Sequence, residues 1–157
     1  MKTYRVTASS LMKTPAGTVY SILADYQNGH PHVLPPKYFS GLEIEEGGIG
    51  AGTRIRFQMN AFGKTQTFRA AITELVPGRT LVETDLESGA VTTFTVLPLE
   101  DNHGCHVTIS TELKAREGPI GFIERSITSL FLRRVYAQEL RMLSEFAGGT
   151  GELHRGA

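Results

Sequence analysis

Apolar and polar residues alternate with a period of two through most of the middle of the chain. Turn-forming residues such as Pro77-Gly78 and Ser88-Gly89 separate the alternating segments, which span 42–47, 53–59, 65–76, 80–86, 90–97 and 105–114. Such alternation is typical of strands that bury one face. Short connections make consecutive strands antiparallel neighbours. The pattern therefore predicts an antiparallel meander, preceded by a further strand at residues 4–11.

The register of each hairpin assigns the strand side chains to one of two faces. Pairing around the Pro77-Gly78 turn places Ile72 opposite Thr84, and the next turn places Thr84 opposite Thr92. A slip of one residue would expose the apolar set, so we require one register to fit every hairpin. The inner face predicted in this way is apolar and carries Ile55, Phe57, Met59, Phe68, Ala70, Ile72, Val82, Leu86, Phe94, Val96, Cys105, Val107, Ile109 and Leu113. The outer face is polar and includes Arg56, Arg69, Glu83, Asp85, Thr93 and Thr108.

Two short helical segments are expected between the first strand and the meander. Thr14 is a suitable N-cap and Pro15 suits a first helical position, so a helix is predicted from there to about Tyr26. Residues 27–41 contain several glycines and prolines, which predict a loop with one short helical turn.

A long helix is predicted from Gly118 to Ala147, with Gly148-Gly149 as its stop. Its apolar stripe is not straight, because two groups of apolar side chains lie about 100° or more apart around the axis. The first group is Ile120, Ile123, Ile127, Leu130 and Phe131, and the second is Val135, Met142, Leu143 and Phe146. We therefore expect the helix to bend or to change its contact surface near residues 131–134. One half would pack on the sheet and the other would roof a cavity.

Length and composition narrow the classes of protein. The 157 residues predict one domain at 1–147, with a flexible tail at 148–157. Lys and Arg together number 16, as do Asp and Glu, so the net charge of zero argues against general attraction to nucleic acid. One cysteine, Cys105, permits no internal disulfide. There is no long apolar run and no secretory signal at the start, so a cytoplasmic protein without an integral membrane segment is expected.

The order of elements resembles that of the START-like superfamily, also called SRPBCC, helix-grip or Bet v 1-like. Within it the chain is similar to the polyketide cyclase/dehydrase and lipid-transport family. The residues that carry the resemblance are Val6 to Ser10, Pro15 to Tyr26, Gly50-Ala51-Gly52-Thr53 and Ile72 to Arg79. The resemblance implies an α+β fold in which a curved antiparallel β-sheet wraps around a long C-terminal α-helix, with two short helices after the first strand. It also implies a cavity between the sheet and that helix.

The predicted inner face and helix supply a candidate set of binding residues. The cavity is expected to be lined by Phe57, Met59, Phe68, Ile72, Thr84, Thr92, Phe94, Ile109, Thr111, Ile123, Ile127 and Phe131. Its mouth is expected at Tyr26, His30, His32 and Tyr38. The inner threonines either orient a ligand or satisfy themselves by local hydrogen bonds. No cofactor or metal site is predicted, since the segment 30–32 offers two histidines without further ligands.

Three functional hypotheses remain open from the sequence. The first is a non-catalytic protein that binds or carries a hydrophobic or amphipathic small molecule. The second is a cyclase, aromatase or hydrolase, for which Glu74, Tyr26, His30 and Tyr38 are the ionisable candidates, although no catalytic signature is present. The third is a quinone-binding protein or a protein-interaction module, with no identified protein partner.

Overall fold

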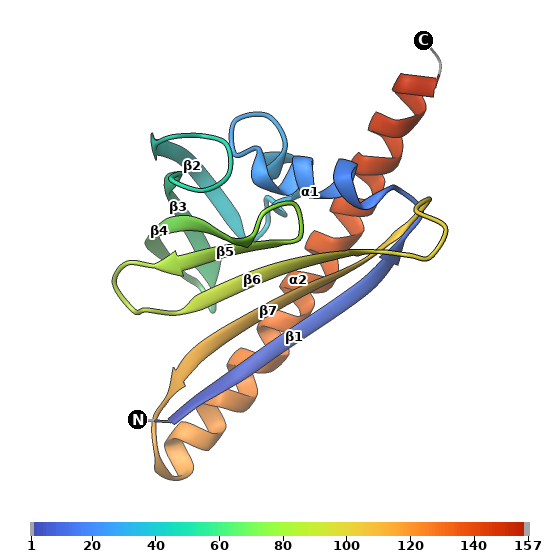
Figure 1. Ribbon diagram of the computed structural model, residues 1–157. Coiled ribbons are helices and arrows are strands. Elements are labelled where there is room, and N and C mark those ends of the chain that lie inside the picture. The colour runs from blue at the N-terminus through green and yellow to red at the C-terminus, as the bar shows by residue number, and fades with distance from the viewer. Residues whose placement is uncertain (1, 156–157) are drawn as a thin grey trace.

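A single antiparallel sheet forms the frame of the molecule. The computed structural model describes residues 2–155, and the side chains of residues 2–149. Seven strands lie in the order β1-β7-β6-β5-β4-β3-β2 (Figure 1). They are β1 (Lys2–Met12), β2 (Phe39–Glu46), β3 (Arg54–Ala61), β4 (Lys64–Val76), β5 (Thr80–Asp85), β6 (Val91–Pro98) and β7 (Cys105–Ala115). Each strand expected from the alternation is confirmed.

The helices follow the predicted order and confirm the helix-grip architecture. They are α1 (Ala16–Ala24), the 3₁₀ turn η1 (His30–Val33) and α2 (Gly118–Arg155). The expectation of two short helices is only partly met, because η1 is one 3₁₀ turn. Pro31 suits its first turn, and Pro35, which lacks a backbone N–H, stands two residues after its end.

The predicted stop of the long helix at Gly148-Gly149 is wrong, because α2 continues through both glycines to Arg155. No atom outside the helix lies within 4 Å of a Cβ built on either glycine, so this part of α2 lacks close neighbours. Figure 1 shows the last turns projecting past the sheet. Glycine lowers helix propensity by about 1 kcal/mol relative to alanine, a cost that weakens a helix without ending it. Residues 156–157 of the predicted tail lie outside the described part.

The register is as predicted at both ends of the meander and differs at β5. Near the turn, Val76 lies opposite Thr80, as expected, but Glu74 then lies opposite Leu81 because a bulge at Leu75 adds one residue to β4. A bulge of this kind shifts the pairing by one. Because strand side chains alternate, that shift inverts the two faces of β5.

The inversion moves Glu83 and Asp85 to the inner face, and Val82 and Thr84 to the outer face, which corrects four predictions. Thr84 lies opposite Val91 on β6, so a second slip of one residue follows at the next hairpin. The two slips cancel, and Phe94 lies opposite Ile109 as predicted. Only β5 therefore presents the face opposite to the one expected.

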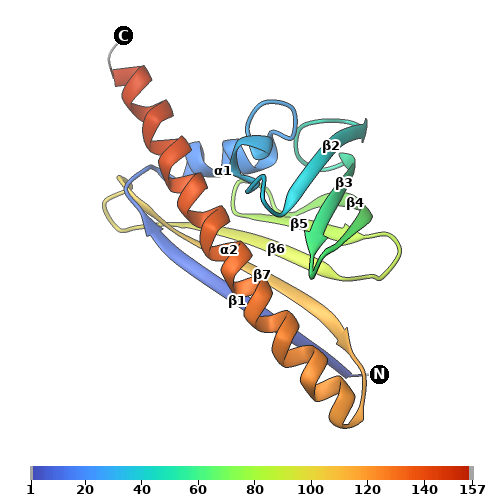
Figure 2. The ribbon, with the colours of Figure 1, turned by 180° about the vertical axis from the view of Figure 1, so that it is seen from behind.

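The long helix covers only part of the sheet. Figure 2 shows α2 running along β1 and β7, whereas β2, β3 and β4 turn away from it. The second half of α2 forms the helical side of the core. Its buried residues are Leu132, Val135, Tyr136, Glu139, Leu140, Leu143 and Ala147. The predicted change of contact surface near residues 131–134 is confirmed by this burial.

The first half of α2 corrects a further prediction. Ile123 is 57% and Ile127 is 50% exposed. At 100° per residue, both lie roughly opposite Tyr136 and Leu143 around the axis. They therefore point away from the sheet and do not line a space beneath the helix.

Candidate functional site

A row of polar side chains crosses the inner face of the sheet where the second half of α2 packs on it. Glu83 on β5 lies opposite Thr92 on β6, and Thr92 lies opposite Thr111 on β7. Apolar residues flank the row, with Ile72 opposite Glu83 on one side and Val6 opposite Thr111 on the other. The predicted ladder of threonines is thus present for Thr92 and Thr111, with Glu83 in the place expected for Thr84.

Glu83 is held by two aromatic side chains from the segment after α1. The Tyr26 hydroxyl donates a hydrogen bond to Glu83 Oε1 at 2.7 Å. His30 Nε2 lies 3.5 Å from the same oxygen. The two rings stack with centroids 4.4 Å apart, and His30 also meets the edge of Phe94. Burial, followed by the charge of Glu83, raises the pKa of Tyr26, which keeps this hydroxyl protonated.

The hydrogen bonds of His30 determine where its proton lies. Nδ1 is 2.7 Å from the carbonyl oxygen of Leu23, and a carbonyl only accepts, so Nδ1 carries a proton. Nε2 then faces Glu83 Oε1 at 3.5 Å, which is longer than a normal hydrogen bond. The imidazole is therefore fixed by the backbone of α1 and lies beside Glu83 in the core.

A second group of hydroxyls continues the row toward α2. Thr92 and Thr111 share a hydrogen bond of 2.8 Å between their hydroxyl oxygens. Thr111 also makes a short hydrogen bond with the hydroxyl of Tyr136 on α2. Burial raises the pKa of Tyr136, so its hydroxyl also stays neutral. These contacts tie the helix to the sheet and satisfy each hydroxyl.

Glu139 is the exception in this network. Its side chain is 4% exposed. Within the described residues, its carboxyl group forms no hydrogen bond or ion pair, and its oxygens are not fully enclosed, unlike Asp85 Oδ1. Burial raises the pKa of Glu139 well above its ordinary value, and the charge of Glu83 adds to that effect. We call the set Tyr26, His30, Glu83, Thr92, Thr111, Tyr136 and Glu139 the polar cluster.

An aromatic wall extends from the polar cluster along the uncovered part of the sheet. Phe57 on β3 and Phe68 on β4 stack with ring centroids 5.6 Å apart, and Phe39 on β2 packs against Phe57. Met59 shares their face. These four side chains are only half-buried, although they belong to the inner face. Solvent therefore reaches apolar side chains on a surface that the helix leaves open.

Phe131 on α2 bounds this wall on the helix side. Its ring meets Tyr38 edge-on at 5.5 Å and Phe62, at the tip of the β3–β4 hairpin, at 5.0 Å. Phe131, Val135 and Glu139 succeed one another along one side of the helix. On β4, Phe68 and Ile72 share the inner face, and Ile72 lies opposite Glu83. Both walls thus run from an aromatic end to a carboxyl end, over roughly 12–13 Å.

The residues expected at the mouth divide into two pairs. Tyr26 and His30 are 1% and 2% exposed, so the expectation that they lie at the mouth is wrong. They turn inward because Glu83 and the carbonyl of Leu23 satisfy their polar atoms. His32 is exposed and stacks on Phe146 of α2, and Tyr38 is half-buried beside Phe131.

Glu74, the carboxyl group first considered for chemistry, has a structural role. Its Oε2 accepts a hydrogen bond of 2.6 Å from the hydroxyl of Tyr20 on α1. Its Oε1 accepts one of 2.9 Å from the backbone N–H of Ala51. The bond from Tyr20, followed by that from Ala51, lowers the pKa of Glu74. The carboxylate therefore fastens α1 and the β2–β3 loop to β4.

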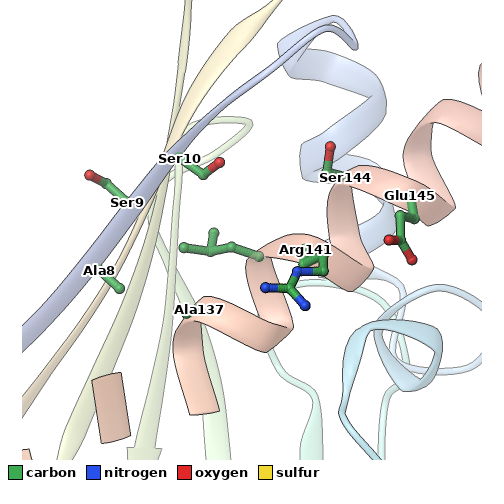
Figure 3. Close-up of a pocket in the computed structure, with 8 residues that line it drawn as sticks. Ala8, Ser9, Ser10, Ala137, Arg141, Ser144 and Glu145 are labelled. Atoms are coloured by element: carbon green, nitrogen blue, oxygen red, sulfur yellow. The ribbon is translucent and has the colours of Figure 1, made fainter. Parts of the chain in front are cut away.

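Two hollows lie on the surface, outside the polar cluster. One of about 500 Å³ lies between β1 and α2 and is lined by Ala8, Ser10, Arg141 and Ser144, among others (Figure 3). Apart from Leu140, its lining side chains are small or charged, and it lies on the β1 side of α2, away from the aromatic wall. The other, of about 200 Å³, is bordered by residues that include Leu34, Phe39 and Phe57. We take the second as the approach to the site, because it opens at the aromatic wall.

Other kinds of site find little support in the part of the chain that the structure describes. Residues 2–155 contain no group of three or more His, Cys, Asp or Glu side chains placed to hold a metal ion. No helix within those residues has the length and hydropathy needed to cross a bilayer. Cys105 is free and buried, and burial raises the pKa of its thiol, which disfavours the reactive thiolate.

Three of the cluster residues were not anticipated from the sequence: Glu83, Tyr136 and Glu139. The alternation of β5 favoured the wrong face, because Val82 and Leu86 look more suitable for a core than Glu83 and Asp85. A signal existed for Glu139, which is an acidic residue within the second apolar stripe of the helix. A charged residue on the buried side of a helix is rarely tolerated without a role.

Known proteins resemble this chain over almost its whole length. One family, described as polyketide cyclase / dehydrase and lipid transport, matches residues 3–147. No curated protein matches the chain. The solution structure of the KanY protein (ms6282) is 26% identical with a TM-score of 0.81, and the match covers 94% of this chain and 99% of that chain.

Two crystal structures of lower identity show the same fold. TTHA0849 from Thermus thermophilus is 19% identical with a TM-score of 0.77, covering 94% of this chain and 99% of that chain. The Zhui aromatase/cyclase from Streptomyces sp. R1128 is 17% identical with a TM-score of 0.77, covering 94% of each chain.

Proposed function

We propose that this protein, which belongs to the polyketide cyclase / dehydrase and lipid transport family, binds a hydrophobic or amphipathic small molecule between its sheet and α2. The binding surface is the aromatic wall, and the polar cluster lies at its inner end. Small-molecule sites are commonly apolar with a few placed polar groups, which is the composition found here.

The observation that carries the proposal is the partial exposure of the aromatic wall. Phe57, Met59 and Phe68 point to the inner side of the sheet, yet each remains half-buried instead of being covered by α2. Exposed contiguous apolar surface is unfavourable in water unless a partner covers it. Each Å² of apolar surface that a ligand covers contributes roughly 25 cal/mol before the costs of association are subtracted. A ligand that covers these side chains would supply the burial that the helix does not.

A fluorescence titration with 1-anilinonaphthalene-8-sulfonate tests the proposal. We expect saturable binding to the folded protein, weakened several-fold by Phe57→Ala, because truncation removes a ring from the aromatic wall. Native mass spectrometry of the same samples should report one bound molecule per chain.

The matched control is Phe122→Ala, on the outer surface of α2. Phe122 is 60% exposed, so its truncation removes as large a ring without touching the wall. Loss of binding in Phe122→Ala with unchanged binding in Phe57→Ala would contradict the proposal, because the probe would then lie on the outside of the helix.

A further inference from the structure

Glu139 has the properties of a hydrogen-bonding group that awaits a partner. Every other ionisable or hydroxyl side chain of the polar cluster contacts a neighbour in the cluster. Glu139 is 4% exposed and has no such contact among the described residues. Its oxygens are not fully enclosed, because Asp85 Oδ1 is the one fully enclosed side-chain oxygen without a partner in that part of the chain. A buried polar group left without a hydrogen bond costs about 1–3 kcal/mol. The carboxyl group of Glu139 borders accessible space, where a bound molecule would supply the hydrogen-bond partner that the chain does not.

The surroundings of Glu139 determine which of its two forms is present. The groups that act on it are Glu83 from β5, Tyr26 from the segment after α1, and Tyr136 from its own helix, with His30 paired to Glu83. Tyr26 and Tyr136 are neutral, so neither supplies a positive charge to Glu139. An ionised Glu139 would be a second carboxylate near Glu83 without a partner. Such a charge is strongly disfavoured in a protein interior.

The protonated carboxyl group therefore offers a hydrogen-bond donor. A carboxylic acid has one O–H donor in addition to its acceptor capacity. Phe131 and Glu139 lie along the same side of α2, so a molecule on the aromatic wall brings its inner end toward this O–H. The complementary ligand group is an uncharged oxygen that accepts.

Resting on the proposed function, we propose that Glu139 in its carboxylic-acid form donates a hydrogen bond to a carbonyl oxygen of the bound ligand. The site then selects apolar molecules that carry a ketone, ester or amide oxygen at one end. An ammonium group is the opposite case, because it would require Glu139 to ionise beside Glu83.

Three probes of nearly equal shape test this selection. They are 2-acetylnaphthalene, 2-ethylnaphthalene and 1-(2-naphthyl)ethylamine, which present a carbonyl, a methylene and an ammonium group on the same ring. Affinities are measured by fluorescence for the wild type, Glu139→Gln and Glu139→Leu. Glu145→Gln is the matched control, because Glu145 is exposed on the same helix and lies outside the polar cluster.

We expect the wild type to bind the ketone roughly 2–10-fold more tightly than the hydrocarbon, the range of one hydrogen bond. Glu139→Gln keeps that preference because its amide also donates, Glu139→Leu loses it, and Glu145→Gln behaves as the wild type does. The wild-type preference should decrease as pH rises and Glu139 ionises, whereas that of Glu139→Gln should not.

Two results overturn the inference while the proposed function stands. One is binding of all three probes with no preference for the ketone. The other is preferential binding of the amine that Glu139→Gln abolishes, which would show an ionised carboxylate. Failure of the wild type to bind any of the three probes would instead overturn the proposed function, and this inference with it.

Discussion

The two halves of α2 have opposite relations to the sheet. In residues 118–130 the least exposed positions are small or polar, such as Gly121, Thr128 and Ser129. The apolar side chains of that half are 50–68% exposed, namely Ile120, Phe122, Ile123, Ile127 and Leu130. From Leu132 to Ala147 most apolar side chains are buried in the core, namely Leu132, Val135, Leu140, Leu143 and Ala147.

This contrast shows that an apolar stripe does not identify the face that a protein covers. Both halves have amphipathic sequences, and their stripes differ in direction. The apolar stripe of the second half faces the sheet, because β1 and β7 run alongside α2 (Figure 2). The apolar stripe of the first half faces solvent, so these side chains make few packing contacts with the rest of the chain.

Truncation in the second half should have the largest effect on stability. Leu143 is 1% exposed, so Leu143→Ala leaves a cavity and should lower the free energy of unfolding by about 2–5 kcal/mol. Urea denaturation followed by circular dichroism measures the change. A loss below about 1 kcal/mol would mean that the second half does not hold the core together.

Replacement of the buried carboxyl group should stabilise the same half. Glu139→Leu removes an unpartnered polar group from the core and should raise the free energy of unfolding by about 1–3 kcal/mol at neutral pH. Glu145→Leu, on the exposed side, should change it little. A destabilised Glu139→Leu would show that Glu139 already has a partner within the fold.

The same residue predicts a pH dependence that is specific to the second half. The pKa of Glu139 is raised in the folded state, from an ordinary value of 4.5. The unfolded chain therefore releases this proton at lower pH than the folded protein, so stability is full below pH 4.5 and falls as pH rises. The difference in unfolding free energy between Glu139→Gln and the wild type should thus increase from pH 4.5 to pH 8. Parallel pH profiles from urea melts would contradict this.

Truncation in the first half should have the smallest effect. Ile127 is 50% exposed, and Ile127→Ala removes few contacts, so the free energy of unfolding should change by no more than about 0.5 kcal/mol. Urea denaturation of Ile127→Ala and Leu143→Ala under the same conditions compares the two halves of α2 directly. A loss comparable to that of Leu143→Ala would place Ile127 in the core.

The candidate site was predictable only in part, and β5 shows why. Phe57, Phe68, Thr92 and Thr111 were placed on the inner face correctly, because their hairpins have regular pairing. Glu83 was not, because a bulge at Leu75 carries no clear sequence signal. Local pattern favoured Val82 inside, and contacts with Tyr26 and His30, distant along the chain, support the opposite face. Functional sites are the places where a sequence is expected to depart from simple apolar–polar alternation, as β5 does at Glu83.

Local chemistry by itself determined the elements of this protein and their order. Alternation defined the strands, turn residues defined the hairpins, and the long amphipathic segment defined α2, since each depends on residues close together in the chain. The tertiary structure alone decided which face of β5 and which stripe of α2 are buried, and that Glu83 and Glu139 lie in one core. Those outcomes depend on contacts between segments that are distant in sequence. The pattern of neighbouring residues does not reveal the energy of such contacts.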